Sequence, residues 1–501
     1  MAQQTVARND LSRAFLFKNG IDVCTPSYLY FPCLGVDALS QDFGDVTRIE
    51  CPDPYNYGKY IEVAQVPGEI SRMTTTLTTR LSRTELSLFR NFAVKGCGFD
   101  MHIHFGLCQK PNDYNAFDKM LIFEDVFVTN YGTDALTALQ SSDRETIMET
   151  IDITIGNYVE VVPLTFSQRE IQLVAGLLPI IDMVYADNAS CGVDCSSPSD
   201  GCQDIFAITS DGTILWSRDG GKTYTLGAND WDTTDSNVGI GYLNDFVFTY
   251  INDANLSVVF ATKRDALDDV APTVVASFIG NPSNYVYTDL GVGAGVAIVV
   301  GEDGFIAVTD NPTTGFDEIY PGVYSTENLT KVQFRPGSDT ALIVGDNGAV
   351  VSYINGEFES INTVGSAIAT LALTASLPAG DNKFLVGDDQ GNIYCSTEPE
   401  VPSSWTQIRT PKTNSGAAVT DIALVHSHIL IATFDDGEIL ISYDGGGTWN
   451  KHEQVSAKTN HLTAAVLNDV LVCSYDVNKV NFGGANGAAG YLLQGFVPGS
   501  N

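Results

Sequence analysis

The chain has 501 residues, of which 44% are hydrophobic and 17% charged, a composition typical of packed globular domains rather than of disordered chains. Its 26 Lys and Arg residues and 61 Asp and Glu residues leave a formal net charge of −35. A surface this acidic repels phosphate, which excludes a basic groove for tight nucleic-acid binding.

The charge divides unevenly along the chain. Residues 1–175 hold 14 basic and 22 acidic residues, a net −8, which leaves 12 and 39, a net −27, for residues 176–501. The N-terminus lacks the sustained apolar run of a signal peptide, and Pro179 and Asp182 interrupt the most apolar window, LVAGLLPIIDMVYA. We therefore expect a chain made in the cytoplasm with no membrane insertion.

The ten cysteines are too sparse for a disulfide scaffold. Three of them, Cys191, Cys195 and Cys202, lie within twelve residues, with no His or further Cys nearby to complete a zinc site. Free thiols or one disulfide are favoured over a metal for this cluster, and the sequence leaves that choice open. The other seven have the scattered spacing of buried thiols: Cys24, Cys33, Cys51, Cys97, Cys108, Cys395 and Cys473.

Residues 1–168 are predicted to form a mainly β domain with one helix. The helix follows from SRTELSLFRNFAVKG, which opens with a capping box at Ser82 and Glu85 and stops at Gly96. The predicted strands are AFLFKNG, YIEVAQV, TTTLTTR, FDMHIHFGLC, KMLIFEDVFVTN, TIMETIDITIG and YVEVVPLTF.

Candidate chemistry in this domain is limited to His102 and His104, which alternate onto one strand face. Two imidazoles without a third ligand type more often line a surface than bind a metal, so no metal is expected. The sequence contains no G-x-S-x-G, H-E-x-x-H or phosphate-loop motif, and we expect no catalytic residues and no cofactor.

The arrangement of this domain resembles the tail tube subunits of tailed bacteriophages over residues 1–168. The resemblance lies in a sandwich-sized set of strands with a single helix, the long segment at 42–72 and the threonine-rich MTTTLTTR before the helix. It implies a β-sandwich that assembles into stacked rings, hexameric in the family, around a lumen that conducts DNA. Such a lumen is expected to be acidic, because DNA must slide past it without tight binding.

Downstream of residue 168, short glycine turns recur between pairs of apolar strands. Successive turn glycines lie 92, 44, 43 and 46 residues apart, and the first interval holds one further copy at FVFTYINDANLSVVFAT. A period near 45 residues with four short strands each is typical of a β-propeller. The turn glycines are Gly212, Gly304, Gly348, Gly391 and Gly437.

We therefore predict a seven-bladed propeller over residues 169–501. Blade seven, which includes DVLVCSYD and GYLLQGF, shows only three strands and lacks a fourth. Since a propeller must close or leave an open sheet edge, EIQLVAG at 170–176 is the predicted closing strand.

Two copies of S-x-D-x-G-x-T-[WY], SRDGGKTY and SYDGGGTW, lie in this region and resemble the Asp-box of sialidase-type and related propellers. The Asp is expected to accept backbone N–H groups across a tight turn, the Gly to supply an unusual dihedral, and the aromatic residue to pack between blades. These boxes are structural in this interpretation, with no catalytic role. Their residues are Ser217, Asp219, Gly221, Thr223, Tyr224, Ser442, Asp444, Gly446, Thr448 and Trp449.

Sialidases hold an anionic sugar with three arginines from different blades. Only four arginines follow residue 175, and Arg218 falls inside a motif turn. We therefore expect no enzyme activity and read the chain as a structural virion protein: a tail tube subunit assembled in the host cytoplasm, with the propeller as an exterior decoration.

The expected partners are other copies of the chain, other tail proteins and viral DNA passing through the lumen, with host surface glycan as a candidate ligand of the propeller. A decoration of this size would occupy the space of a contractile sheath, so the tail is expected to be non-contractile. Three alternatives stay open: a tail-tip or fibre-associated glycan-binding adhesin, a sialidase-like glycoside hydrolase, and a cellular assembly scaffold.

Overall fold

The structure is a computed structural model of the whole chain. It describes residues 13–18, 24, 28–31, 34–36, 47–52, 60–66, 72–80, 88–105, 119–133, 148–161, 179–185, 204–217, 223–226, 238–243, 246–253, 256–263, 267, 273–277, 285–293, 295–311, 315–319, 322–335, 338–380, 383–409, 416–426, 429–452, 460–466, 479–486 and 489–496.

The chain divides into two compact units. Unit 1 comprises residues 1–20 and 27–163, and unit 2 comprises residues 21–26 and 164–501. The chain therefore passes between the units three times, twice around residues 21–26 and once at 163/164.

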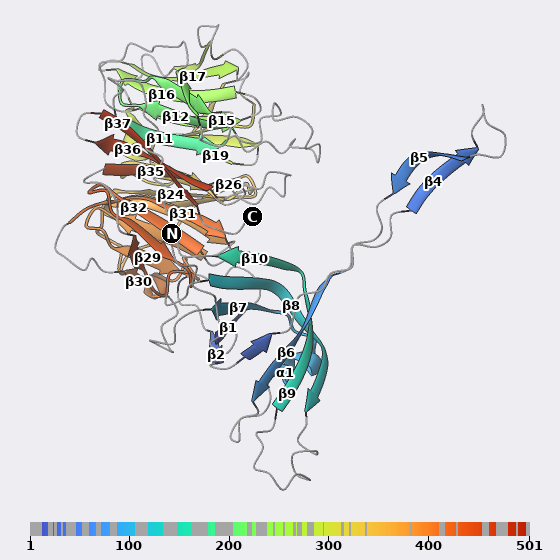
Figure 1. The fold of residues 1–501 in the computed structure, drawn as a ribbon. Helices are drawn as coiled ribbons and strands as arrows, with labels where there is room; N and C mark the ends of the chain where they lie inside the picture. Colours follow the sequence, from blue (N-terminus) through green and yellow to red (C-terminus); the bar gives the residue numbers. More distant parts are fainter. Residues whose placement is uncertain are drawn as a thin grey trace. The chain divides into compact units, whose positions relative to one another are not determined.

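Unit 1 is mainly β with one α-helix among its described residues, as the sequence predicts (Figure 1). Every strand quoted from the sequence for this domain has a counterpart, and three further strands, β2, β3 and β4, were not predicted. The elements are β1 (Arg13–Lys18), β2 (Leu29–Phe31), β3 (Leu34–Val36), β4 (Thr47–Pro52), β5 (Tyr60–Val66), β6 (Met73–Arg80), α1 (Leu88–Lys95), β7 (Phe99–Phe105), β8 (Lys119–Thr133), β9 (Met148–Ile155) and β10 (Asn157–Val161).

The long strand β8 connects the two halves of the main sheet of unit 1. Its order is β2-β1-β7-β8-β9-β6-β3, and β10 also pairs with β8. The first half of β8 pairs with β7 and β10, whereas the second half pairs with β9. The change falls at Asp125, whose φ of 52° is rare for a residue with a side chain. The backbone kink divides the sheet into two halves.

Side chains from both halves and from α1 meet in one core. It includes Leu16 of β1, Leu77 of β6, Phe89 of α1 and Ile153 of β9. The helix ends as predicted at Gly96, which has a φ of 63° and donates its N–H to the Phe92 carbonyl. The capping box predicted at Ser82 and Glu85 lies outside the described residues.

Strands β4 and β5 form a separate two-stranded sheet. Cys51 of β4 lies opposite Ile61 of β5, and the register shifts between Ile49 and Glu50. The sequence predicted β5 as a strand within a long extended segment and did not predict that the segment folds into a hairpin.

Unit 2 contains seven successive antiparallel sheets, in agreement with the predicted β-propeller. Six have four strands, and the seventh has three among the described residues. The strands are β11 (Ile180–Tyr185), β12 (Ile205–Thr209), β13 (Ile214–Ser217), β14 (Thr225–Leu226), β15 (Val238–Leu243), β16 (Phe246–Asp253), β17 (Leu256–Lys263), β18 (Thr273–Ser277), β19 (Tyr287–Gly293), β20 (Val296–Gly301), β21 (Ile306–Thr309), β22 (Asp317–Ile319), β23 (Leu329–Phe334), β24 (Ala341–Gly345), β25 (Val350–Ile354), β26 (Glu357–Ser360), β27 (Leu373–Gly380), β28 (Lys383–Asp388), β29 (Ile393–Ser396), β30 (Thr406–Arg409), β31 (Val419–His426), β32 (Ile429–Phe434), β33 (Ile439–Ser442), β34 (Asn450–His452), β35 (Asn460–Val466), β36 (Lys479–Asn486) and β37 (Ala489–Phe496), with 3-10 turns η3 (Glu302–Gly304), η4 (Asp346–Gly348) and η5 (Pro402–Ser404).

The first strand of each sheet contacts the first strand of the next. These contacts run from β11 through β15, β19, β23, β27 and β31 to β35, and β35 contacts β11 in turn. The seven sheets therefore form a closed ring of blades whose first strands surround the axis.

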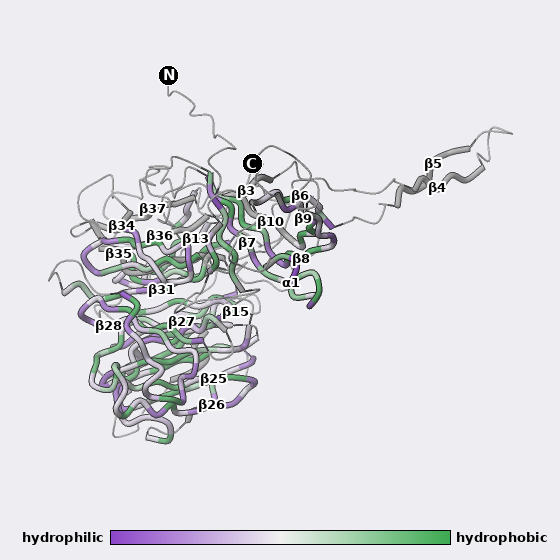
Figure 2. Tube along the Cα trace, turned by 90° about the horizontal axis from the view of Figure 1, so that it is seen from below, coloured by the Kyte–Doolittle hydropathy of each residue, from purple (hydrophilic) through white to green (hydrophobic). Residues whose placement is uncertain are grey.

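The paired apolar strands that the sequence predicts around each repeat turn are the second and third strands of blades one to six. In Figure 2, hydrophobic stretches, coloured green, alternate with hydrophilic stretches along the described part of the propeller. For blade seven, the predicted strand DVLVCSYD and the predicted closing strand at 170–176 both lie outside the described residues.

Candidate functional site

The five repeat glycines all lie at hairpin turns between the second and third strands of a blade. Each has a positive φ: 84° at Gly212, 73° at Gly304, 68° at Gly348, 81° at Gly391 and 84° at Gly437. At Gly304 a Cβ would also lie 1.8 Å from the Ser325 carbonyl oxygen, so both the backbone conformation and the space require glycine.

The second motif turn, Ser442–Trp449, joins β33 to β34 and is held by a network around one carboxylate. Ser442 Oγ donates to Asp444 Oδ1 at 2.9 Å and accepts the Gly446 N–H at 2.8 Å. Thr448 donates to Asp444 twice, through its N–H at 2.8 Å and its hydroxyl at 2.7 Å. The Ser, Asp, Gly and Thr positions of the motif thus supply the donors and acceptors of one closed turn.

Asp444 is only 1% exposed. Burial raises the pKa of its carboxyl above the ordinary value, even though Thr448 and Ser442 donate hydrogen bonds to it. Trp449 packs against an apolar cluster that contains Leu385 of blade five and Leu430 of blade six. The carboxylate is therefore buried, and its hydrogen bonds close within the turn itself.

The first motif copy is described in part. Ser217 is 1% exposed at the end of β13, and Thr223 is exposed. Tyr224 packs against a cluster of blade one that includes Ile180 and Ala207. Asp219 and Gly221 lie outside the described residues.

A second repeated feature lies at the propeller axis and was not predicted. In blades three, four and five the first strand shifts register at one threonine, as at a β-bulge. Each threonine hydroxyl donates to a carbonyl of the next blade's first strand: Thr288 to Leu329, Thr330 to Leu373, and Thr374 to Val419, the last at 2.6 Å. These three bonds clasp blades three to six together. We call the three residues the threonine clasps.

The residue after the bulge is charged in four blades, and these side chains interact around Lys331 of β23. Lys331 Nζ lies 3.6 Å from Asp289 Oδ2. Burial disfavours the charged lysine, but Asp289, Asp182 and Asp421 outweigh it and raise the pKa of Lys331. We call Asp182, Asp289, Lys331 and Asp421 the axial cluster.

Two of these carboxylates also bind the neighbouring blade through its backbone. Asp182 Oδ2 accepts the Ile240 N–H at 3.0 Å, and Asp289 Oδ2 accepts the Val332 N–H at 2.7 Å. Burial raises the pKa of Asp182 from its ordinary 3.8 to about 7, with Lys331 opposing and Asp289 reinforcing the shift. The axial cluster is therefore a cross-blade electrostatic tie with one carboxyl that titrates near neutrality.

The signal for these axial residues was present in the sequence. A short pattern of an apolar residue or tyrosine, then threonine, occurs as YTDL, LTKV, LTAS and VTDI, with threonines 42, 44 and 46 residues apart. The turn glycines lie elsewhere in the repeat, so their spacing does not reveal this threonine pattern.

Of the four arginines considered for an anion site, Arg409 is engaged in the junction of blades five and six. Its guanidinium lies 2.9 Å from Glu438 Oε2 and 4.1 Å above the Phe434 ring, and it donates to the Gly391 carbonyl. Burial lowers the pKa of Arg409, an effect that Glu438 opposes. Arg218 and Arg264 lie outside the described residues.

In unit 1 the expectation of a surface histidine pair is wrong. His102 and His104 are both 0% exposed, and their rings lie 4.3 Å from Phe17 and 4.6 Å from Phe15. Burial, followed by the nearby Arg13, lowers the pKa of His104 well below 6.5. Alternation along a strand placed both histidines on one face, but both faces of this strand are buried.

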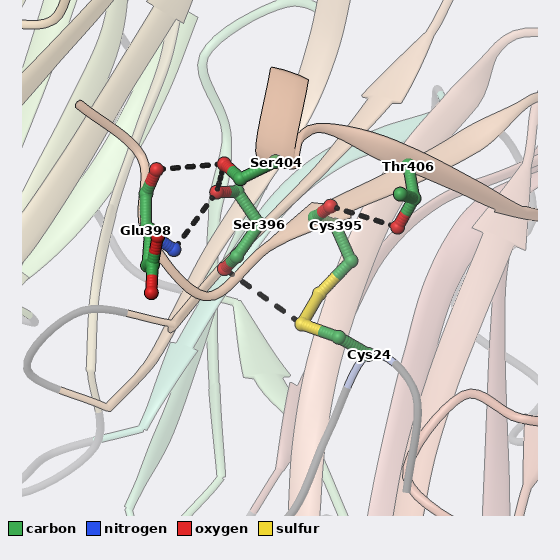
Figure 3. Close-up of a disulfide and its surroundings, with 6 residues drawn as sticks. All are labelled: Cys24, Cys395, Ser396, Glu398, Ser404 and Thr406. Carbon is green, nitrogen blue, oxygen red and sulfur yellow. Dashed lines mark hydrogen bonds between the residues drawn. A yellow bond between two sulfur atoms is a disulfide. The ribbon is translucent and has the colours of Figure 1, made fainter. Parts of the chain in front are cut away.

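The expectation of buried thiols is wrong for three cysteines, Cys24, Cys395 and Cys97. Cys24 and Cys395 form a disulfide across 371 residues of sequence (Figure 3). Cys97 is a free and exposed thiol. Cys191, Cys195 and Cys202 lie outside the described residues.

Within the described ranges, no three His, Cys, Asp or Glu side chains come together as a metal site would require. A separate check of the described helices finds none with the length and apolarity to cross a membrane.

No protein-family model and no curated protein matches the sequence. Solved propeller structures are similar in fold. "YCF48 bound to D1 peptide" is 16% identical with a TM-score of 0.46, covering 67% of this chain and 96% of that one. YCF48 from Cyanidioschyzon merolae is 15% identical with a TM-score of 0.47, covering 65% and 98%. The WD40 propeller domain of Doa1 is 12% identical with a TM-score of 0.46, covering 67% and 96%. The likeness concerns the β-propeller over about two-thirds of the chain and carries no statement about function.

Proposed function

We propose that the chain is a structural virion protein, a tail tube subunit in which residues 1–168 assemble into stacked rings and the propeller decorates the exterior. The motif turns are Asp-boxes in this proposal, used to fold blades rather than to bind substrate. The enclosed hydrogen bonds of Asp444 support that part.

The observation that carries the assembly proposal is the β4–β5 hairpin. It is a two-stranded sheet on its own among the described residues. An isolated two-stranded hairpin is at best marginally stable in water, because it buries too little apolar surface. Its free strand edges would be satisfied by pairing with, or packing on, another copy of the chain.

The propeller also supports the assignment of assembly to residues 1–168. Its first strands close a ring, and its blades are linked by the threonine clasps and the axial cluster. It therefore gains little from neighbouring copies. The net −27 of residues 176–501 also makes decorations on adjacent subunits repel one another.

Negative-stain microscopy of the purified full-length protein, at rising concentration, tests the proposal. We expect rings or tubes with knobs on the outer surface. Monodisperse single particles at every concentration would overturn the assembly role and would favour the glycan-binding adhesin. Hydrolysis of a sialoside by the same preparation would favour the glycosidase.

A further inference from the structure

The disulfide joins a residue from the first part of the sequence to the propeller. Residues 21–26 group with unit 2, although the residues on both sides of them belong to unit 1. Within unit 2, Cys24 lies in the apolar cluster between blades five and six, which contains Ala375, Leu385 and Ile422. Cys24 thus packs in the propeller, although the residues on both sides of 21–26 belong to unit 1.

Three groups hold Cys24 in this place. Its sulfur is bonded to Cys395 at the end of β29. Its N–H donates to the Gly445 carbonyl at 3.0 Å, inside the second motif turn. Its Sγ lies 3.7 Å from the Ser396 carbonyl oxygen (Figure 3). The site is therefore built by both blades at their junction.

The backbone of Cys24 shows that this seat constrains it. Its φ is 83°, a conformation that side-chain-bearing residues avoid. Such a conformation persists only where the surroundings fix it. Without the covalent bond, only noncovalent contacts are left to hold it: the backbone hydrogen bond to Gly445, the contact of Sγ with Ser396 and apolar burial.

In the reduced form, the Cys24 thiol also has a hydrogen-bond acceptor nearby. When the bond is open, the Cys24 thiol can donate to the Ser396 carbonyl oxygen that lies 3.7 Å away. The site between blades five and six therefore accommodates Cys24 in both redox states. The oxidised state is held covalently, and the reduced state is held by noncovalent contacts alone.

We propose that Cys24 and Cys395 are a redox-controlled latch that attaches residues 21–26 to the propeller. A chain made in a reducing cytoplasm keeps its cysteines as thiols, and oxidation follows on exposure to a small-molecule disulfide outside the cell. The closed latch fastens unit 2 to the chain at a second place besides the passage at 163/164. This inference does not depend on tube formation.

Closure proceeds by thiol–disulfide exchange with a low-molecular-weight disulfide such as oxidised glutathione. The Cys24 thiolate attacks one glutathione sulfur, forming a mixed disulfide and releasing one glutathione thiolate. The Cys395 thiolate then attacks the Cys24 sulfur and releases the second. Two protein thiols are oxidised to one disulfide, and one glutathione disulfide is reduced to two thiols, which take up the two protons that the cysteines lose.

The burial of both sulfur atoms limits the rate of thiol–disulfide exchange. Cys24 is 3% exposed and Cys395 is 0% exposed, so a reagent reaches the sulfurs only when the Cys24 segment leaves its seat. We expect dithiothreitol to reduce the bond at least about tenfold more slowly in native protein than in urea, since access requires local opening.

The first test identifies the bond in the full-length chain. Protein purified under reducing conditions is treated with oxidised glutathione, alkylated, and digested without reductant. Mass spectrometry is expected to find the Cys24 and Cys395 peptides joined. Finding both cysteines alkylated after oxidation of folded protein would overturn the proposal.

The second test measures the latch by hydrogen exchange at the Cys24 amide. Reduction should speed its exchange by about tenfold or more, because local opening no longer breaks a covalent bond, while amides of the buried strand β32 keep their protection. Cys24→Ser should match the reduced protein in either condition, and the control Cys97→Ser should match wild type. Equal protection of the Cys24 amide in both redox states, or loss of protection in β32 as well, would show that the bond is no local latch.

Discussion

The two units of this chain solve the problem of free strand edges in opposite ways. The propeller closes its first strands into a ring and ties neighbouring blades through Thr374, Asp289 and Lys331. Among its described residues, unit 1 instead has an open sheet, with the three-residue strands β2 and β3 at its ends, and a separate hairpin β4–β5. A closed ring has little to gain from another copy, whereas an open sheet with an isolated hairpin has much.

The largest effect is expected from a proline in the hairpin. Ala64→Pro in β5 removes one N–H, which either pairs with β4 or forms part of the free edge. We expect loss of rings and tubes in micrographs, with the propeller's melting transition unchanged.

The reciprocal variant sharpens the same contrast. Glu359→Pro lies in β26, the outer strand of blade four. It should lower the melting temperature of the propeller and leave assembly intact. Assembly lost in the second variant and kept in the first would reverse the roles assigned to the two units.

Within the propeller, the axial cluster is the most sensitive point. Lys331→Met leaves Asp182 and the buried Asp289 and Asp421 without their cation, which should lower the free energy of unfolding by about 3–5 kcal/mol. Denaturant unfolding measures the change. The control Lys263→Met, at an exposed lysine, should have little effect, and equal effects of the two would remove the cluster from the account.

The titration of Asp182 gives a prediction with a definite sign. Because its pKa is raised from 3.8 to about 7, the folded state holds a proton that the unfolded state has lost between these values. This contribution to stability is complete below the unfolded pKa and disappears as pH rises through 7. Relative to Asp182→Asn, wild type should therefore lose stability from pH 4 to pH 7 in denaturant unfolding. The same pH dependence in both proteins would contradict the raised pKa of Asp182.

A smaller loss is expected in the second motif turn. Asp444→Ala removes the acceptor of three hydrogen bonds and should lower the free energy of unfolding by about 1–3 kcal/mol. Asp310→Ala serves as the exposed control. Unchanged stability accompanied by loss of a hydrolytic activity would identify Asp444 as functional rather than structural.

The smallest effect is expected from one threonine clasp. Thr374→Val keeps the side-chain shape but leaves the Val419 carbonyl without this donor, which should cost about 1 kcal/mol. The exposed Thr225→Val in β14 is the matched control. An indistinguishable pair of melting curves would mean that the clasps do not contribute to blade cohesion.

The sequence allowed prediction of features whose signals are local. Glycine turns between apolar runs located the middle strands of six blades, and the helix end at Gly96 followed from one residue. Strand periodicity found most of unit 1 for the same reason, since alternation and turns are properties of neighbouring residues.

The missed features depend on residues far apart in the chain. Cys24 and Cys395 are 371 residues apart, and no spacing rule pairs them. Asp182 and Lys331 interact only because the ring brings different blades to one axis. The burial of His102 was equally hidden, because alternation shows which face a side chain shares but not what covers that face.

The central claim is that unit 1 builds the wall of an assembly and the propeller lies outside it. A cryo-electron microscopy reconstruction of the particles formed by the full-length protein tests it most directly. We expect a wall of unit 1 around an acidic lumen, with one propeller per subunit on the outer surface. Propellers lining the channel, or particles held together by contacts between propellers, would contradict it.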